Sequence, residues 1–280
     1  MSFIEALKFL LLGIVQGITE VLPISSSGHV ELFKVLLGVD VEQHLLFLIL
    51  VNTGSLVAFF VIFARDLLAL FMAFFRFLFV PTKRAENRDG FQYVLKLLIA
   101  SIPAAIVGLT LNHYIEAALG LYGILLSGIG LLATGTILLL TSRLHFHHGN
   151  TSISMTDAAL IGIAQAFALI PGLSRSGTTT STALSRGLGL NSALKFSFLM
   201  YIPVSIGSLI MEINDFFDAG AILPPTSTVL SFGMAFVAAI FATYFAYKII
   251  FNIFRSGRLR LFSTYCFGVG LLSIALYIAL

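Results

Sequence analysis

The stretch GIVQGITEVLPISSSGH at Gly13–His29 has a second copy in the chain, GIAQAFALIPGLSRSG at Gly162–Gly177. Identical residues keep one spacing, 149 residues (162 minus 13 for the first pair): Gly13 and Gly162, Gln16 and Gln165, Ser25 and Ser174, Ser27 and Ser176, Gly28 and Gly177. Each copy is an apolar run interrupted by proline, serine and glycine. Broken hydrophobic segments at matching places in two halves are typical of membrane proteins built from repeats, and they mark the binding site.

The composition is that of an integral membrane protein. Of the 280 residues, 58% are hydrophobic and 10% are charged, and the mean hydropathy is +1.02. Soluble domains carry about 25% charged residues, so this chain could not cover its surface with polar groups in water. The net charge of +3 is small and does not favour nucleic-acid binding. The expected partner is therefore the lipid bilayer.

Apolar runs long enough to cross a bilayer, which takes roughly 20 residues, occur at six places. They are 45–64, 93–111, 120–141, 193–211, 227–250 and 261–280. The motif regions 3–38 and 153–189 each read as two short apolar helices around a polar break, which is typical of a re-entrant hairpin that lines a cavity. The predicted fold is an all-α polytopic membrane protein in one domain, 1–280. Repeat one spans 1–149 and repeat two spans 150–280, each with one hairpin and three spans.

Charges between the spans predict the orientation. Lys and Arg gather in 65–92 and 248–260, which are therefore expected on the cytoplasmic side. The segment after the fourth span carries Glu212, Asp215 and Asp218 without Lys or Arg, and it is expected to be an outer loop. An odd number of spans in each half inverts the second copy, so the repeat is of inverted topology. Both termini should lie outside, and the hairpin tips should meet near the midplane.

The first span is the least regular of the six. Asn52 and Thr53 interrupt it and are candidates to face the cavity, while Glu42 and His44 are expected at the outer mouth. The apolar segment 66–80 follows the span directly. We expect this segment to be interfacial or a cytoplasmic extension of the first span.

The first break holds ionisable groups at membrane depth. Gln16 and Glu20 lie four residues apart and share one helix face. A carboxylate costs at least about 2.5–3.5 kcal/mol at that depth, so it is rare without a purpose or a partner. We predict that Glu20 is a general acid or base or a metal ligand, with Gln16 as a second oxygen ligand. Such oxygens suit Mg²⁺ or Ca²⁺. The alternative is that Glu20 only pairs with Arg175 and joins the hairpins.

A serine-rich turn follows Glu20. Ser25, Ser26, Ser27 and Gly28 open the second short helix, where backbone N–H groups and hydroxyls make a cradle for an anion. Serines also cap helices without binding a ligand, which is the alternative interpretation. His29 adds an ionisable group to the same break, and we interpret it as functional rather than structural.

The second break, Pro171–Thr179, repeats the cradle and adds a guanidinium at Arg175. This group stays charged and can bind phosphate oxygens with two parallel hydrogen bonds. Ser174 and Ser176 flank it, so we predict a phosphate site at this break. The alternative role of Arg175 is the ion pair with Glu20, and both roles are compatible when no ligand is bound.

These two motifs, Gln16–Glu20 running into Leu22–His29 and Pro171–Thr179, resemble those of the bacterial undecaprenyl-pyrophosphate phosphatase family, the bacitracin-resistance type. The resemblance covers the whole chain. It implies removal of the terminal phosphate of undecaprenyl pyrophosphate, which gives the lipid carrier for cell-wall precursors, and dependence on a divalent metal. The family's functional positions fall here on Glu20, Ser26, His29, Ser174, Arg175 and Thr179. Its first motif position is Glu or Gln, so Gln16 leaves Glu20 as the only motif carboxylate.

The resemblance thus implies hydrolysis of undecaprenyl pyrophosphate at the bacterial cell membrane, in the service of peptidoglycan synthesis, cell shape and bacitracin resistance. The predicted catalytic residues are Glu20, Ser26, His29 and Arg175; the pyrophosphate contacts are Ser25, Ser27, Ser174, Ser176 and Thr179; the metal ligands are Glu20 and Gln16. The site is expected to open outward, with the prenyl chain in the lipid, and a homodimer is compatible with this interpretation.

Two questions stay open at this point. The nucleophile is Ser26, His29 or a metal-bound water. The rival function is a transporter or flippase of a lipid phosphate, because inverted repeats favour alternating access as strongly as they favour an enzyme. Serine, histidine and arginine chemistry in the breaks favours the enzyme, since transport alone does not need it.

Overall fold

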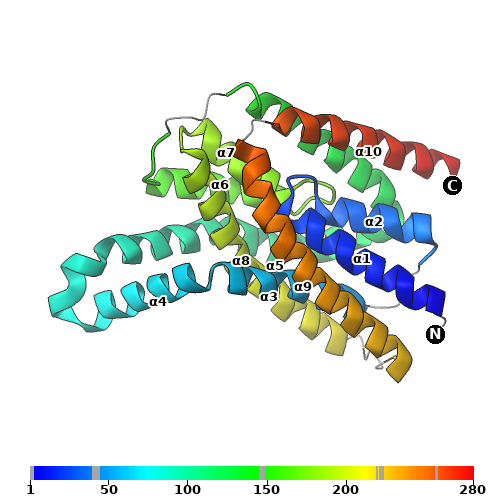
Figure 1. Cartoon of the computed structure of the whole chain (residues 1–280), viewed down its shortest axis with the longest axis horizontal. Coiled ribbons are helices and arrows are strands. Elements are labelled where there is room, and N and C mark those ends of the chain that lie inside the picture. The colour runs from blue at the N-terminus through cyan, green and yellow to red at the C-terminus, as the bar shows by residue number, and fades with distance from the viewer. Residues whose placement is uncertain (1–2, 40–44, 145–148, 219, 221–223, 256–257) are drawn as a thin grey trace.

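The computed structural model describes residues 3–39, 45–144, 149–218, 220, 224–255 and 258–280. Across these residues the regular secondary structure is helical, apart from an isolated bridge between Asn150 and Leu188. The elements in chain order are α1 Phe3–Val21, α2 Ser26–Leu37, α3 Leu45–Ile62, α4 Ala64–Phe79, the 3₁₀ helix η1 Pro81–Lys83, α5 Arg84–Thr141, α6 Met155–Phe167, α7 Arg175–Ser185, α8 Leu190–Asp218, α9 Thr226–Arg255 and α10 Leu259–Ala279 (Figure 1).

The pairs α1–α2 and α6–α7 are helical hairpins with matching caps. Ser25 precedes α2 and its hydroxyl accepts the N–H of Gly28 at 3.3 Å. Ser174 precedes α7 and accepts the N–H of Gly177 at 3.1 Å. The turn of the second hairpin depends on Gly172, whose φ of 80° is open to glycine without strain. Both motif copies therefore form two helices around a polar break, as expected, although α1, with 19 residues, is longer than the short helix predicted there.

Helical segments long and apolar enough to cross a membrane account for most of the remaining described chain. They are Pro81–Leu111, Ala117–Thr141, Leu190–Asp218, Thr226–Ile250 and Leu259–Ala279. The pair α3 and α4, which meet at a bend of 73°, makes a sixth if counted as one span. The first segment begins in η1 and continues into α5, and the second lies within α5, which is interrupted by non-helical dihedral angles at Tyr122. All six predicted apolar runs fall on these helices, which confirms an all-helical membrane fold with five to six candidate spans.

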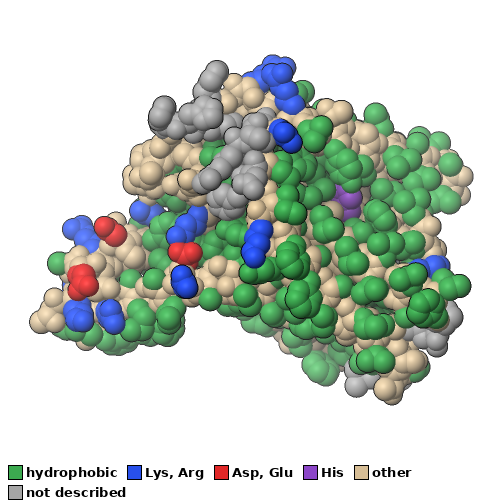
Figure 2. All heavy atoms as spheres, in the orientation of Figure 1, with side chains coloured by type: hydrophobic (Ala, Val, Ile, Leu, Met, Phe, Trp, Pro, Cys, Tyr) green, Lys and Arg blue, Asp and Glu red, His purple; other side chains and the backbone are tan. Residues whose placement is uncertain are grey.

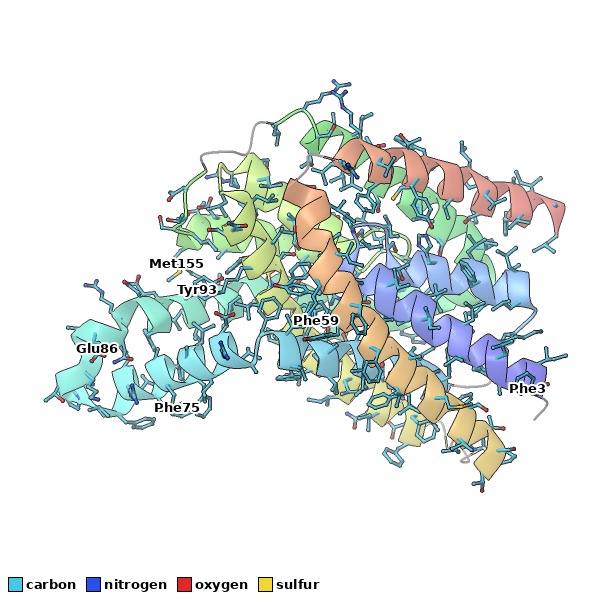
Figure 3. The ribbon with its side chains drawn as sticks, viewed as in Figure 1. Phe3, Phe59, Phe75, Glu86, Tyr93 and Met155 are labelled. Atoms are coloured by element: carbon cyan, nitrogen blue, oxygen red, sulfur yellow. The ribbon has the colours of Figure 1, made fainter. Side chains whose placement is uncertain are left out.

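An arm made of α4 and the first turns of α5 projects from the bundle (Figure 1). The ring of Phe77 stacks on Phe91 at 4.1 Å between centroids, so the two helices run side by side. Phe75 and Glu86, labelled in Figure 3, lie on this arm. The segment 66–80, expected to be interfacial or an extension, is thus a helix bent away from the first span.

Glycines let the hairpins pack closely on helices from the opposite half of the chain. A Cβ on Gly13 of α1 would lie 2.8 Å from the Cα of Ala235 in α9. A Cβ on Gly162 of α6 would likewise lie 2.8 Å from the Cα of Ala100 in α5. Only glycine admits such a close approach of two helix backbones. Each hairpin is therefore held by a long helix of the other half.

The buried core lies where the hairpins meet α3 and α8. Phe59 of α3, at the centre of Figure 3, is 1% exposed, and its ring centroid lies 4.6 Å from that of Tyr201 in α8. Outside this core, large apolar side chains such as Leu109 and Phe241 are exposed. Figure 2 shows hydrophobic side chains over most of one face, with many of its charged side chains over the projecting arm. This distribution suits a protein whose surface faces lipid.

Candidate active site

The turns of the two hairpins meet and hydrogen-bond to each other. The N–H of Gly172 donates to the Ser27 hydroxyl at 3.4 Å, and the Ser176 hydroxyl donates to the Leu22 carbonyl at 3.2 Å. From α5, the hydroxyl of Thr134 donates to the Gly172 carbonyl at 3.1 Å. The two polar breaks, far apart in the sequence, therefore form one continuous structure.

A cavity of about 260 Å³ lies at this junction, walled by both hairpins together with α3 and α8. The predicted site residues that line it are Glu20, Ser25, Ser26, Ser27, Ser174, Arg175 and Ser176. Asn52 and Thr53 also line it, as their place in the first span suggested. Glu42 and His44, expected at the outer mouth, lie outside the described residues.

The centre of the cavity wall is an ion pair between the hairpins. One carboxylate oxygen of Glu20 accepts a hydrogen bond from the Arg175 guanidinium. Arg175 also donates to the Ser205 hydroxyl at 3.3 Å, and its Cζ lies 4.0 Å from the ring centroid of Tyr201. A guanidinium between a carboxylate and an aromatic face is fixed in orientation, with edges left to bind an anion.

The other oxygen of Glu20 organises the first hairpin. It accepts the Ser26 hydroxyl at 2.7 Å and the side-chain amide of Gln16 at 2.9 Å. Gln16 also donates to the Asn52 side chain at 3.0 Å, and Asn52 donates to Glu212 at 3.5 Å. A carboxylate that accepts a serine hydroxyl at this distance can take its proton, so Ser26 and Glu20 have the geometry of a nucleophile and its base.

Two helix N-termini point into the same junction. The first residues of α2 and α7 directly follow the capping residues Ser25 and Ser174, both of which line the cavity. N-terminal N–H groups and the helix dipole favour negative charge at such a place. Two of them, with hydroxyls from both hairpins and the guanidinium of Arg175, make a site suited to a diphosphate.

Some predicted site residues do not reach the cavity. His29 is 2% exposed and hydrogen-bonds at one ring nitrogen to the Ser25 carbonyl and at the other to the Tyr265 hydroxyl, each at 2.8 Å. Thr179 is fully buried, and its hydroxyl donates to the Arg175 carbonyl at 2.8 Å. Gln16 lies behind Glu20 and presents its NH₂ group to it.

Helix α8 contributes cavity residues that the sequence analysis missed. It brings Tyr201, Ser205, Ser208 and Glu212 to the wall. The segment that carries Glu212, Asp215 and Asp218 was predicted to be a loop, and this is wrong, because α8 continues to Asp218. The signal was present in the spacing: positions 201, 205, 208 and 212 follow i, i+4, i+7 and i+11, which is one face of a helix.

Oxygen donors around the cavity fit a hard divalent cation. Glu20 and Glu212 supply carboxylates and Asn52 an amide oxygen, the ligand types that Mg²⁺ and Ca²⁺ prefer. Within the described part of the chain, no group of three or more His, Cys, Asp or Glu side chains forms a metal cluster. A cation with few protein ligands that completes its shell with phosphate oxygens and water is consistent with both facts.

Comparison with known proteins places this geometry in context. The family described as Bacitracin resistance protein BacA matches residues 9–272. The chain is 40% identical over 274 residues to undecaprenyl-diphosphatase 1 of Bacillus cereus, covering 98% of each protein. It is 38% identical over 271 residues to undecaprenyl-diphosphatase 1 of Bacillus licheniformis, covering 97% of this chain and 98% of that protein. For undecaprenyl-diphosphatase of Oceanobacillus iheyensis, the identity is 39% over 273 residues, with 97% and 96% covered.

Proposed function

The chain belongs to the bacitracin resistance protein BacA family, and from this membership we propose that it hydrolyses undecaprenyl pyrophosphate to undecaprenyl phosphate and inorganic phosphate. Relatives similar over nearly their whole length carry the name undecaprenyl-diphosphatase. The product is the lipid carrier on which cell-wall precursors are built, so the enzyme recycles that carrier for peptidoglycan synthesis in the bacterial cell membrane.

One observation carries the assignment of the site. Glu20, Ser26 and Arg175 converge in a single cavity from two hairpins, with the N-termini of α2 and α7 on either side. This arrangement combines a positive group, two anion-binding helix ends and a serine bonded to a carboxylate. Phosphoryl transfer needs these elements, because catalysis there consists mainly of positioning and of stabilising negative charge.

Substrate binding begins with an exchange of partners at Arg175. Its guanidinium pairs with Glu20 when the cavity is empty of substrate, and it turns to the terminal phosphate when the diphosphate enters. Hydroxyls of Ser174 and Ser176, with N–H groups at the two helix ends, bind the remaining phosphate oxygens. Glu20 is then released from its ion pair and is free to act as a base.

The nucleophile is the Ser26 hydroxyl. Its proton passes to Glu20, the Ser26 oxygen bonds to the terminal phosphorus, and the bond from that phosphorus to the bridging oxygen breaks, which releases undecaprenyl phosphate. Glu20 gives that proton to the departing phosphate oxygen and is again a carboxylate. Water then attacks the phosphoserine, Glu20 takes a proton from the water and passes it to the Ser26 oxygen, and the bond from phosphorus to that oxygen breaks, which releases inorganic phosphate and restores the serine. What supports Ser26 over His29 is that Ser26 lines the cavity and donates to Glu20.

A divalent cation, Mg²⁺ or Ca²⁺, is proposed at the same cavity. Glu20, Glu212 and the Asn52 amide oxygen are the residues that would hold it, while Gln16 orients Glu20 from behind. When bound, such an ion neutralises negative charge on the diphosphate.

We also propose that the two hairpins are re-entrant and belong to inverted repeats, 1–149 and 150–280. The matching contacts of Gly13 with Ala235 and of Gly162 with Ala100 support this arrangement, because each hairpin then uses the other repeat in the same way. Both termini lie at the same end of the molecule, as an even number of crossings requires (Figure 1). With the basic segments in the cytoplasm, the cavity opens outward beside the acidic end of α8.

Phosphate release from C55 pyrophosphate by the purified protein in nanodiscs tests the function. We expect turnover by the wild type, loss of turnover with EDTA, and loss on Ser26→Ala. The matched control is Ser185→Ala, an exposed serine at the end of α7, which should keep wild-type turnover. The same protein in closed vesicles tests the rival function: transport of labelled lipid phosphate across the bilayer without hydrolysis would favour a flippase over the enzyme.

A further inference from the structure

The capping residue of α2 has an unusual backbone. Ser25 has φ 70° and ψ 107°, and it is the only non-glycine residue with positive φ in the part of the chain that the structure describes. Side chains other than that of glycine are rarely tolerated there, and such strain persists only when the surroundings hold it. Ser26, which bonds to Glu20, is the next residue. The direction of Ser26 therefore depends on a strained peptide.

The second repeat supplies an internal comparison. Ser174 occupies the equivalent position and makes the equivalent cap to a glycine N–H, but its φ is −68° and its ψ is 116°, which any residue adopts. The cap alone therefore does not require the strained backbone. The residue of the second copy that corresponds to His29, 149 positions later in the chain, is Thr178. The strain occurs in the copy that carries the histidine.

Contacts of His29 explain what holds the turn. Its Nδ1 lies 2.8 Å from the Ser25 carbonyl oxygen, which can only accept, so Nδ1 carries the proton. Its Nε2 lies 2.8 Å from the Tyr265 hydroxyl of α10, which donates to it when the imidazole is neutral, and the two rings are nearly parallel, 6° apart in plane with centroids at 5.5 Å. Both ring nitrogens are thus engaged, and His29 is not among the residues that line the cavity.

We propose that His29 and Tyr265 are positioning residues, which fix the strained Ser25 turn and thereby aim the Ser26 hydroxyl at Glu20. This inference rests on the proposed function of the same cavity. It assigns His29 a neutral form protonated at Nδ1 and removes it as a nucleophile. It also brings Tyr265, which belongs to neither motif, into the organisation of the site.

Substitutions at His29 separate positioning from chemistry. The side-chain amide of asparagine can place an N–H close to where Nδ1–H lies, but it can neither attack phosphorus nor act as a base. We expect His29→Asn to keep kcat within about 10-fold of wild type and to leave KM unchanged. His29→Ala should lower kcat on the order of 10²-fold, because the Ser26 hydroxyl is then displaced from its reacting position. If His29→Asn is as inactive as His29→Ala while both fold, His29 takes part in the chemistry and the proposal fails.

A double-mutant cycle tests whether Tyr265 acts through His29. Tyr265→Phe removes only the hydroxyl and is expected to lower kcat severalfold, because the imidazole loses one of its two anchors. In the His29→Asn background the same change should have no effect, since asparagine at 29 does not use that hydroxyl. Equal losses in both backgrounds would show that Tyr265 acts independently of His29, against the proposal.

A stability measurement keeps the inference separate from the proposed activity. Ser25→Gly and Ser174→Gly lose the same capping hydroxyl, but only position 25 gains relief from positive φ. Unfolding can be followed by a thiol-reactive dye, since Cys266 is a buried free thiol. We expect the midpoint of Ser25→Gly to exceed that of Ser174→Gly by roughly 2–4 °C. Equal midpoints would refute the strained turn, whereas a wild type that releases no phosphate would refute the function alone.

Discussion

Glu20 and Arg175 belong to different hairpins, 155 residues apart in the sequence, and form an ion pair across the junction of the two turns. The side chain of Glu20 is 6% exposed and that of Arg175 is 26% exposed, so both charges are largely withdrawn from solvent. Removing one partner of such a pair leaves the other charge without compensation, whereas removing both does not. The contribution of the pair to folding can therefore be separated from its contribution to catalysis.

Single and double variants make that separation. Glu20→Gln and Arg175→Ala should each lower phosphate release on the order of 10²-fold or more, and each should lower the unfolding midpoint. The double variant is expected to recover much of the midpoint while staying inactive. Phosphate release and Cys266 labelling on heating measure the two effects. Near-wild-type turnover in either folded single variant would remove that residue from the mechanism.

Rapid quenching with labelled substrate should trap phosphate on Ser26. Because a phosphomonoester survives acid, the adduct should be acid-stable, and Ser26→Ala should abolish it. An acid-labile, base-stable adduct would identify a phosphoramidate on His29 instead. Failure to trap either adduct, together with inversion at a chiral phosphorus, would leave a water molecule as the attacking group.

Close packing of the hairpins predicts that replacing glycine by alanine changes stability differently at two positions. Gly162→Ala forces a methyl group against the backbone of Ala100, and such overpacking typically costs about 1–3 kcal/mol. Gly108, in α5, has nothing within 4 Å of an added Cβ, so Gly108→Ala should leave stability equal or slightly higher. Thermal unfolding compares them, and equal stabilities would mean that the α6–α5 contact is looser than described.

Accessibility labelling checks the proposed topology. On a Cys266→Ser background, cysteine at exposed position 86 should react only from the cytoplasmic side, and cysteine at exposed position 218 only from outside. The reason is the excess of Lys and Arg around the first position and of acidic residues around the second. Labelling of both from one side would contradict the inverted repeats.

Much of the site could be predicted because the two polar breaks are easily recognised within the apolar sequence. Proline, serine and glycine inside an apolar run end one helix and cap the next, so the starts of α2 and α7 follow from local chemistry. The meeting of Glu20 with Arg175 follows as well, since an isolated charge at membrane depth needs a partner.

The remainder depends on directions that no local pattern encodes. The polar face of α8 was missed because a long apolar window averages Ser205, Ser208 and Glu212 with the leucines and isoleucines around them. His29 bonds to the carbonyl of Ser25, and a positive φ at that serine is not readable from sequence. The hydroxyl of Thr179 donates to the carbonyl of Arg175, four residues earlier, as threonine in a helix often does.

The contact between α1 and α9 also bears on how the chain is made. When Gly13 is added to the growing chain, its partner Ala235 is still 222 residues (235 minus 13) from being translated, and Arg175 has yet to neutralise Glu20. The N-terminal hairpin must wait, uncovered on its glycine face, until nearly the entire polypeptide has been inserted. Either half synthesised alone would lack the helix that receives its own hairpin, so the enzyme is completed only by its last third.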